Sequence, residues 1–355
     1  MKETSLTTNL SSQMKEILTE YGKFGAPPIS SLSPVMARQL PELRDALQHV
    51  LSHHALKRLS PDSMVESVAH VDHHTIADGL LVRTYRPSGD GPFPIIVYYH
   101  GGGWVIGSIN SYDSSCRALA NSCDAIVVSV AYRQAPEHPY PQARNDAFRA
   151  YLWAMDLARS LGGDPGRVAV AGESAGGNLA AVVCLMARDQ GIRMPLHQLL
   201  IYPITQFGFD TESYLKYAHA KPLDRAMMKY FWRHYLANGA DAKDPYHSPL
   251  LSDNLMGLPP ATVLTAEIDP LRDEGELYAD ALQEAGVPVF QKRYANVAHE
   301  FFGFSNYISE ARQAREDAGE QMRIAFDTAL FEREKIRTTI YTRQPGMSPD
   351  RSPGY

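Results

Sequence analysis

The chain of 355 residues contains only three cysteines, no hydrophobic run of membrane-spanning length and no excess of positive charge. Three cysteines are too few for a disulfide framework, so we expect a reducing, cytoplasmic environment. Because no long apolar run is present, and no apolar core lies near the start, we expect neither a membrane span nor an export signal. The net charge of −6 argues against a nucleic-acid partner, because a phosphate backbone requires a basic surface.

The apolar residues that are present lie in short, strand-like runs separated by helical patterns. Runs such as FPIIVYYH, AIVVSVAY, RVAVAG, QLLIYP and ATVLTAE are continuously apolar, which is typical of strands buried on both faces. The pair Asp78-Gly79 between two strand-like segments predicts a hairpin. We therefore predict an α/β fold with a mostly parallel sheet, flanked by helices, and antiparallel strands at one edge.

Two segments do not follow this alternation of strands and helices. The N-terminal residues contain helical patterns near 10–21 and 35–58, and the residues between Pro203 and Leu258 contain one helical pattern but no strand. The second segment interrupts the sheet at its carboxyl edge, where open α/β sheets bind ligands. We therefore expect N-terminal helices in 1–60, a sheet domain formed by 61–204 and 258–336, an insertion in 205–257 and a disordered, Pro-rich tail in 337–355.

The sequence Gly172-Glu173-Ser174-Ala175-Gly176 directly follows a predicted strand and directly precedes a predicted helix. A G-x-S-x-G motif in this context is typical of a nucleophile elbow, in which a tight turn presents the serine above the sheet. The helix N-terminus also places positive partial charge where negative charge would develop. The alternative is a Gly-rich turn in which the serine is incidental.

A second glycine-rich sequence, His100-Gly101-Gly102-Gly103-Trp104, follows the strand FPIIVYY. Its glycines allow close approach of the backbone to a ligand, and its N–H groups, together with that of Ala175, would form an oxyanion hole. The alternatives are a flexible loop or a phosphate cradle, but no Lys-Ser/Thr pair follows. We interpret His100 as a residue that fixes the loop rather than as a base.

A serine nucleophile requires a base, and the base requires an orienting carboxylate. In the order serine, acid, histidine, Asp269 lies at the end of the strand ATVLTAEI, and His299 is the only histidine beyond it. Glu267 within the strand and Asp273 in the next helix are the alternative acids. Neither the clustered histidines at 70–74 nor the His299-Glu300 pair has the partners of a metal site, so we expect none.

Five segments in this order resemble the bacterial hormone-sensitive-lipase-like esterases, a branch of the α/β-hydrolases: HGGGWVIGS, AYRQAPEHPYPQA, GESAGGNLA, DPLRDEG and VAHEFFGF. The resemblance implies an eight-stranded sheet with a helical cap made of the N-terminal segment and the insertion. It also implies hydrolysis of short- to medium-chain acyl esters without a cofactor, and it allows a homodimer. The implied roles are nucleophile for Ser174, base for His299, orienting acid for Asp269, and oxyanion donors for Gly101, Gly102 and Ala175.

The sequence departs from the family pattern at four positions. Glu173 replaces a commoner aspartate, Glu300 a glycine, Trp104 a phenylalanine and Gln134 a leucine. These differences leave the triad intact and affect the shape of the pocket. The residues that we expect to bind the substrate are Trp104, Glu173, Tyr202, Phe207 and Phe209.

Other activities could use the same residues. Amide, lactone or carbamate hydrolysis needs the same triad, because substrate contacts rather than the fold decide the chemistry. A ligand-binding receptor would be expected to lack a triad member, and a membrane lipase would be expected to carry an exposed apolar helix. The favoured prediction is therefore a serine carboxylesterase that acts on small-molecule esters.

Overall fold

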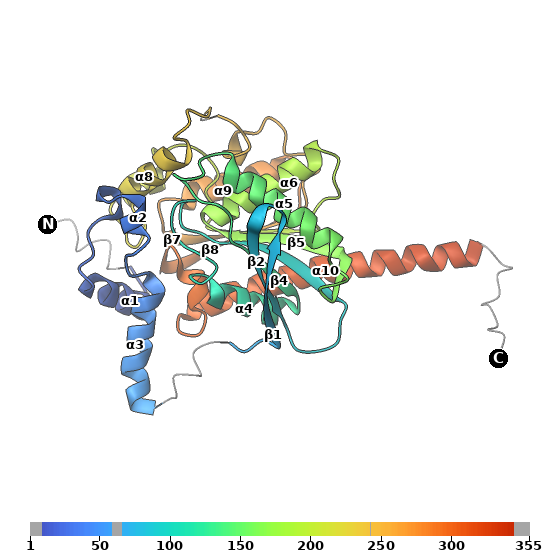
Figure 1. Cartoon of the computed structure of the whole chain (residues 1–355), viewed down its shortest axis with the longest axis horizontal. Helices are drawn as coiled ribbons and strands as arrows, with labels where there is room; N and C mark the ends of the chain where they lie inside the picture. Colours follow the sequence, from blue (N-terminus) through green and yellow to red (C-terminus); the bar gives the residue numbers. More distant parts are fainter. Residues whose placement is uncertain (1–8, 59–65, 242, 344–355) are drawn as a thin grey trace.

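The computed structural model describes residues 9–58, 66–241 and 243–343, and an eight-stranded sheet forms its centre (Figure 1). The strand order is β1-β2-β4-β3-β5-β6-β7-β8. Strand β2 is antiparallel to both of its neighbours, whereas all other neighbouring strands are parallel, so the sheet is mixed. The strands are β1 (His70–Ile76), β2 (Leu80–Arg86), β3 (Phe93–Tyr99), β4 (Ile126–Val130), β5 (Gly163–Glu173), β6 (Gln198–Ile201), β7 (Ala261–Ile268) and β8 (Val289–Ala298).

Helices cover both faces of the sheet, which confirms the predicted α/β layering (Figure 1). In β3, Ile95 and Val97 belong to one core cluster and Ile96 and Tyr98 to the other, because successive side chains of a strand point to opposite faces. The first cluster includes buried residues of α5 (Gln142–Asp156), α6 (Ala175–Asp189) and α9 (Arg272–Glu284). The second includes residues of α4 (Asp113–Cys123) and α10 (Ser309–Arg343).

The N-terminal segment and the insertion lie side by side at one end of the molecule, where α2 is next to α8 (Figure 1). The N-terminal segment contains α1 (Ser12–Lys23), η2 (Ile29–Ser31), α2 (Pro34–Ala37) and α3 (Leu43–Arg58), and the insertion contains α7 (Glu212–Lys216), α8 (Arg225–Tyr235) and η5 (Pro249–Leu251). The single helical pattern predicted near 35–58 is therefore two helices. Pro41 lies between them, and proline inside a helix removes a hydrogen bond and clashes with the preceding turn.

The last helix is longer than its sequence pattern predicts. Helix α10 continues to Arg343, whereas the sequence predicts a disordered tail from residue 337. The segment before Pro345 is rich in Glu, Lys and Arg, which are good helix formers. The α conformation is unfavourable for the residue before a proline, so the helix ends close to Pro345. Residues 344–355, where the rest of the predicted tail falls, lie outside the described residues. Among the described helices, none combines the length and the hydrophobicity that crossing a membrane requires.

Candidate active site

Ser174 lies in a sharp turn between the end of β5 and the start of α6, with φ 57° and ψ −117°. A positive φ is strained for serine, and the surrounding contacts hold it there. The Ser174 N–H donates to the Ile201 carbonyl over 2.9 Å, and the Ser174 carbonyl accepts from the Asn178 N–H over 3.0 Å. A Cβ at Gly176 would lie 1.9 Å from the Tyr99 carbonyl oxygen, so this position requires glycine. The turn therefore has the geometry expected of a nucleophile elbow.

His299 follows β8 and faces Asp269, which follows β7. The two residues are buried, and His299 Nδ1 lies 2.6 Å from Asp269 Oδ2. The other carboxylate oxygen of Asp269 accepts from the Leu271 N–H over 2.9 Å, which fixes the carboxylate. Burial lowers the pKa of His299, but the charge of Asp269 and the hydrogen bond between them outweigh it, so the pKa lies above its usual value. This pair holds the imidazole in one orientation.

The two alternative acids contact other groups. Glu267 accepts from the Asn296 N–H over 2.8 Å. Asp273 accepts from the Ser213 N–H over 2.6 Å and pairs with Arg272. Both carboxylates thus stabilise neighbouring loops and helices, and Asp269 is the carboxylate that contacts the histidine.

The glycine loop after β3 is fixed by close packing. Gly102 and Gly103 have φ values of 105° and 59°, which favour glycine. A Cβ would lie 2.1 Å from the Ile106 carbonyl oxygen at Gly102 and 2.2 Å from the Phe231 ring at Gly103. With no side chains at these glycines, the loop can offer the pocket its backbone N–H groups as donors.

His100 lies below this loop and is almost fully buried. Its ring stacks on Tyr132 with 4.2 Å between the ring centroids, and the Tyr132 hydroxyl donates to the His100 carbonyl over 2.8 Å. Burial lowers the pKa of His100 to about 4, so it is neutral near pH 7. His100 thus packs beneath the loop.

Arg38 connects the N-terminal segment to the glycine loop, a contact that the sequence analysis did not predict. Its guanidinium donates to the Val105 carbonyl over 2.7 Å and to the Ala135 carbonyl over 2.8 Å. It also pairs with both carboxylate oxygens of Glu137, at 2.9 and 2.7 Å. The hydrogen bond from Arg38 lowers the pKa of Glu137 to about 2. The Gln134 side chain adds further support to the loop, because it donates to the carbonyls of Ile106 and Gly107.

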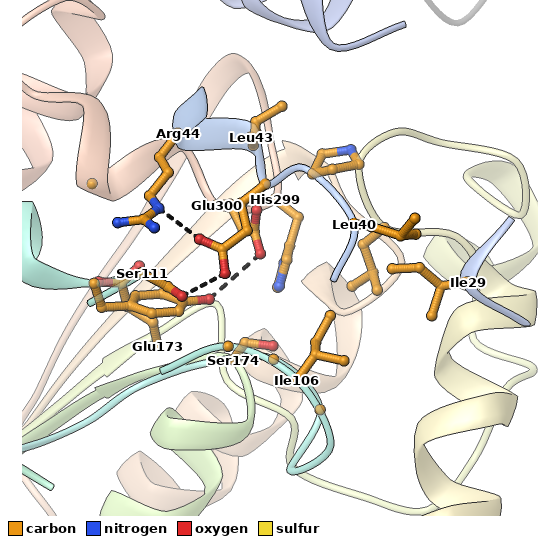
Figure 2. A pocket seen from close by; sticks show the side chains of 18 of the residues that line it. Ile29, Leu40, Leu43, Arg44, Ile106, Ser111, Glu173, Ser174, His299 and Glu300 are labelled. Atoms are coloured by element: carbon orange, nitrogen blue, oxygen red, sulfur yellow. Dashed lines mark hydrogen bonds and ion pairs between the residues drawn. The ribbon is translucent and has the colours of Figure 1, made fainter. Parts of the chain in front are cut away.

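Ser174 and His299 line one pocket with a volume of about 100 Å³ (Figure 2). In Figure 2, Ile29, Leu40 and Ile106 lie to one side of the two residues, and Arg44, Ser111 and Glu300 lie to the other. We call these sides the apolar half and the polar half. Further residues that line the pocket are Leu223, Met227 and Phe231 from the insertion and Tyr21, Glu42 and Tyr112 in the polar half.

Of the residues predicted to bind the substrate, Glu173 lines this pocket, but Trp104, Tyr202, Phe207 and Phe209 do not. Trp104, whose φ is 59°, is fully buried and stacks on Tyr235 with 4.1 Å between the ring centroids. Tyr202 packs against His299 at 4.6 Å and donates to Glu173. Phe207 and Phe209 pack against each other and against neighbouring aromatic rings. The prediction of these four residues as pocket walls is corrected accordingly.

Within the described residues, no group of three or more histidine, cysteine or acidic side chains is arranged to hold a metal ion. The chemistry that the pocket offers is that of a serine, a histidine–aspartate pair and backbone donors.

The comparisons with known proteins agree with this geometry. A family model described as the alpha/beta hydrolase fold matches residues 96–303. The carboxylic ester hydrolase LipN of Mycobacterium tuberculosis is 45% identical over 231 residues, which are 63% of this chain and 61% of that protein. The ethyl acetate hydrolase of Pseudomonas putida is 36% identical over 283 residues, 78% of this chain and 88% of that protein.

A solved structure gives the same result over more of the chain. An ester hydrolase from the metagenome of Lake Arreo, complexed with a bipyridine phosphonate derivative, superposes with a TM-score of 0.78 at 37% identity. The match covers 90% of this chain and 99% of that one. The chain therefore belongs to the α/β-hydrolase superfamily, in the branch of the hormone-sensitive-lipase-like esterases.

Proposed function

We propose that the protein is a serine carboxylesterase that hydrolyses small esters through an acyl-enzyme intermediate. The observation that carries this proposal is that His299, paired with the buried Asp269, lines the same pocket as Ser174, which lies on a strained strand-to-helix turn. The three relatives reported above are named as ester hydrolases, which supports the same chemistry.

In the proposed reaction, His299 Nε2 takes the proton of the Ser174 hydroxyl as the oxygen attacks the ester carbonyl. Asp269 holds the tautomer and stabilises the imidazolium. The N–H groups of Gly101, Gly102 and Ala175 bind the oxyanion. The tetrahedral intermediate collapses, and His299 gives its proton to the leaving alcohol. Water then attacks the acyl-serine with His299 again as the base, which releases the acid and restores Ser174.

The size of the pocket supports short acyl groups as substrates. A volume of about 100 Å³ is below the usual range for sites that enclose a drug-sized ligand. The apolar side chains of Ile29, Leu40, Met227 and Phe231, which come from both cap segments, line the pocket. We propose that short-chain esters are the best substrates and that activity falls as the acyl chain exceeds the medium range.

The test is hydrolysis of p-nitrophenyl esters from acetate to palmitate by the wild type, Ser174→Ala and a control variant, Ser160→Ala. Ser160 is exposed and lies outside the pocket, and its hydroxyl donates to the Leu157 carbonyl. We expect saturable activity that is highest on short chains, a loss of at least about 1000-fold in Ser174→Ala and no loss in Ser160→Ala. If the folded wild type hydrolyses no ester, or cleaves the matching anilides faster than the esters, the esterase proposal is wrong.

The domain organisation of the chain is also part of the proposal. We propose that 1–60 and 205–257 form a cap over a catalytic domain made of 61–204 and 258–336. The free and buried state of Cys116, Cys123 and Cys184 supports a reducing, cytoplasmic location. A homodimer stays a prediction that light scattering can test.

A further inference from the structure

Glu300 directly follows the proposed base and lines the pocket beside Ser174 and His299 (Figure 2). Its backbone has a φ of 67° and a ψ of 8°, the left-handed conformation in which glycine is unstrained and a side chain is not. The chain therefore has a carboxylate side chain at a position where the backbone conformation favours glycine. The position of its carboxylate in the pocket gives it direct access to a bound ester.

Two arginines line the pocket, and both are already paired. Arg38 is paired with both oxygens of Glu137. Arg44 is paired with Glu42 at 2.7 Å and donates to the Asn110 carbonyl over 2.8 Å. Since these guanidinium charges are balanced by other carboxylates, they leave the charge of Glu300 uncompensated.

The other carboxylates of the polar half also have partners. Glu42 pairs with Arg44 and accepts from the Ser111 hydroxyl over 2.6 Å. Glu173 accepts from the hydroxyls of Tyr98 and Tyr202. In contrast, Glu300 forms no ion pair with any described lysine, arginine or histidine, and its hydrogen bond from the Tyr112 hydroxyl is long, at 3.4 Å. Glu300 is thus the carboxyl of the pocket whose charge is least compensated.

Two aromatic rings, Tyr21 and Tyr112, line the same half of the pocket. Burial and, second to it, the nearby charge of Glu300 raise the pKa of Tyr21 to about 12. Tyr21 is therefore neutral and lies close enough to Glu300 to be affected by its charge. A carboxylate without a cationic partner attracts an ammonium group by direct charge pairing. A carboxylate-bearing ester would be repelled by the same groups.

We propose that Glu300 is a specificity-determining residue that makes the pocket prefer esters with an apolar group on one side of the ester bond and an ammonium group on the other. This inference rests on the proposed esterase function and adds a substrate class to it. The apolar group fits the half formed by Ile29, Leu40 and Ile106, and the ammonium group fits the half that contains Glu300.

The preference should depend on pH, because Glu300 must be ionised to attract a cation. Burial raises the pKa of Glu300 to about 7, opposed by the charge of His299 and reinforced by the charges of Glu42 and Glu173. Tyr112, Tyr21 and Tyr202 are the other titratable groups near its charge. The attraction is therefore weak below pH 7 and grows as the pH rises through about 7.

The experiment compares acetylcholine with its uncharged isostere 3,3-dimethylbutyl acetate. The ratio of the two kcat/KM values cancels the titration of His299, because both esters use the same base. We expect the wild type to favour the cationic ester by about 10-fold at pH 8 and by much less at pH 6. In Glu300→Gln, which removes the charge and keeps the shape, the ratio should lose both its size and its pH dependence.

Glu284→Gln is the matched control, because Glu284 is exposed at the end of α9, outside the pocket, and its loss changes the net charge equally. This variant should keep the wild-type ratio. If Glu300→Gln does not fold, Glu300→Gly, which suits the left-handed backbone, replaces it. A ratio that is the same in wild type and in the Glu300 variant overturns the inference and leaves the esterase function standing. The same holds if p-nitrophenyl acetate is hydrolysed and neither of the two esters is. Failure on all three esters overturns both proposals.

Discussion

The Asp269–His299 pair shows how burial and charge oppose each other at one residue. Burial alone would keep the imidazole neutral at low pH, whereas the carboxylate 2.6 Å away stabilises the imidazolium and raises the pKa of His299 above its usual value of 6.5. A base must be neutral to accept a proton. The catalytic rate should therefore rise with pH as His299 loses its proton.

We expect kcat/KM for a neutral ester to rise along a single limb, with its midpoint above the usual histidine value of 6.5. In Asp269→Asn, the raising charge is absent and burial dominates, so the midpoint should move to lower pH. The rate should also fall by about 10⁴-fold, because the tautomer is no longer enforced. Rate measurements across the pH range from mildly acidic to mildly basic test both effects. An unchanged midpoint in the variant would show that Asp269 does not set the basicity of His299.

Glycines in this chain differ in whether an added methyl group would have room. In Gly176→Ala, the new methyl group would lie 1.9 Å from a backbone oxygen that cannot move away, so we expect a large loss of both stability and activity. At Gly22, in α1, a Cβ would have no described atom within 4 Å, and the backbone is ordinary helix. Gly22→Ala should therefore stabilise the protein by about 0.5–1 kcal/mol. Thermal unfolding of the two variants, with an ester assay, distinguishes a local clash from a general intolerance of alanine.

At the scale of elements, the order of strands and helices could be predicted from the sequence, because buried parallel strands are continuously apolar and helices are periodic. The residues of the candidate site could be predicted because Ser174, Asp269 and His299 each follow a strand, and the carboxyl ends of parallel strands meet at one edge. The contact between Arg38 and Glu137 could not be predicted, because the two residues are 99 positions apart and no sequence pattern links them. The direction of Trp104 was also undecidable from the sequence, because an aromatic residue beside the loop fits both core and pocket.

Arg38 should act through the loop that it holds. Arg38→Ala removes two bonds to loop carbonyls and the pair with Glu137, so we expect the unfolding free energy to fall by about 1–2 kcal/mol. We also expect a lower kcat, since the backbone donors of the loop lose their support. Arg38→Lys should not restore either quantity, because an ammonium cannot bond three groups in one plane. Arg312→Ala, at an exposed position of α10, is the control. If Arg38→Ala matches the control in both measurements, the loop does not depend on this contact.

At the scale of the whole molecule, the pocket is assembled from three distant parts of the chain. The N-terminal segment supplies Ile29 and Leu40, and the insertion supplies Met227 and Phe231. The segments that follow the strands supply Ser174 and His299. The N-terminal segment and the insertion meet at one end of the molecule (Figure 1), and each lines only part of the pocket. Acyl-chain preference should therefore depend on both cap segments together.

Shortening a cap side chain should lengthen the preferred acyl chain. Leu40→Ala and Met227→Ala each add room in the apolar half, and each extra methylene that becomes buried is worth about 0.8 kcal/mol. We expect the best p-nitrophenyl ester to become longer by about one or two carbons in each variant, and by more when the two changes are combined. Val35→Ala, at an exposed position of the N-terminal segment, should leave the preferred acyl-chain length unchanged. An unshifted profile in both single variants would mean that the acyl chain binds elsewhere.

The Arg38 contact has a consequence for how such a protein can evolve. Substitutions at Ile29, Leu40 or Met227 change the part of the pocket that the N-terminal segment and the insertion form. The turn at Ser174 and the glycine loop form the other part and need not change with it. The hydrogen bond from Arg38 to Val105 and the packing of Phe231 on Gly103 are contacts at which these two parts of the pocket must remain compatible. N-terminal and inserted segments that keep these contacts can vary elsewhere while the turn and the glycine loop stay as they are, so new substrates become accessible through few mutations.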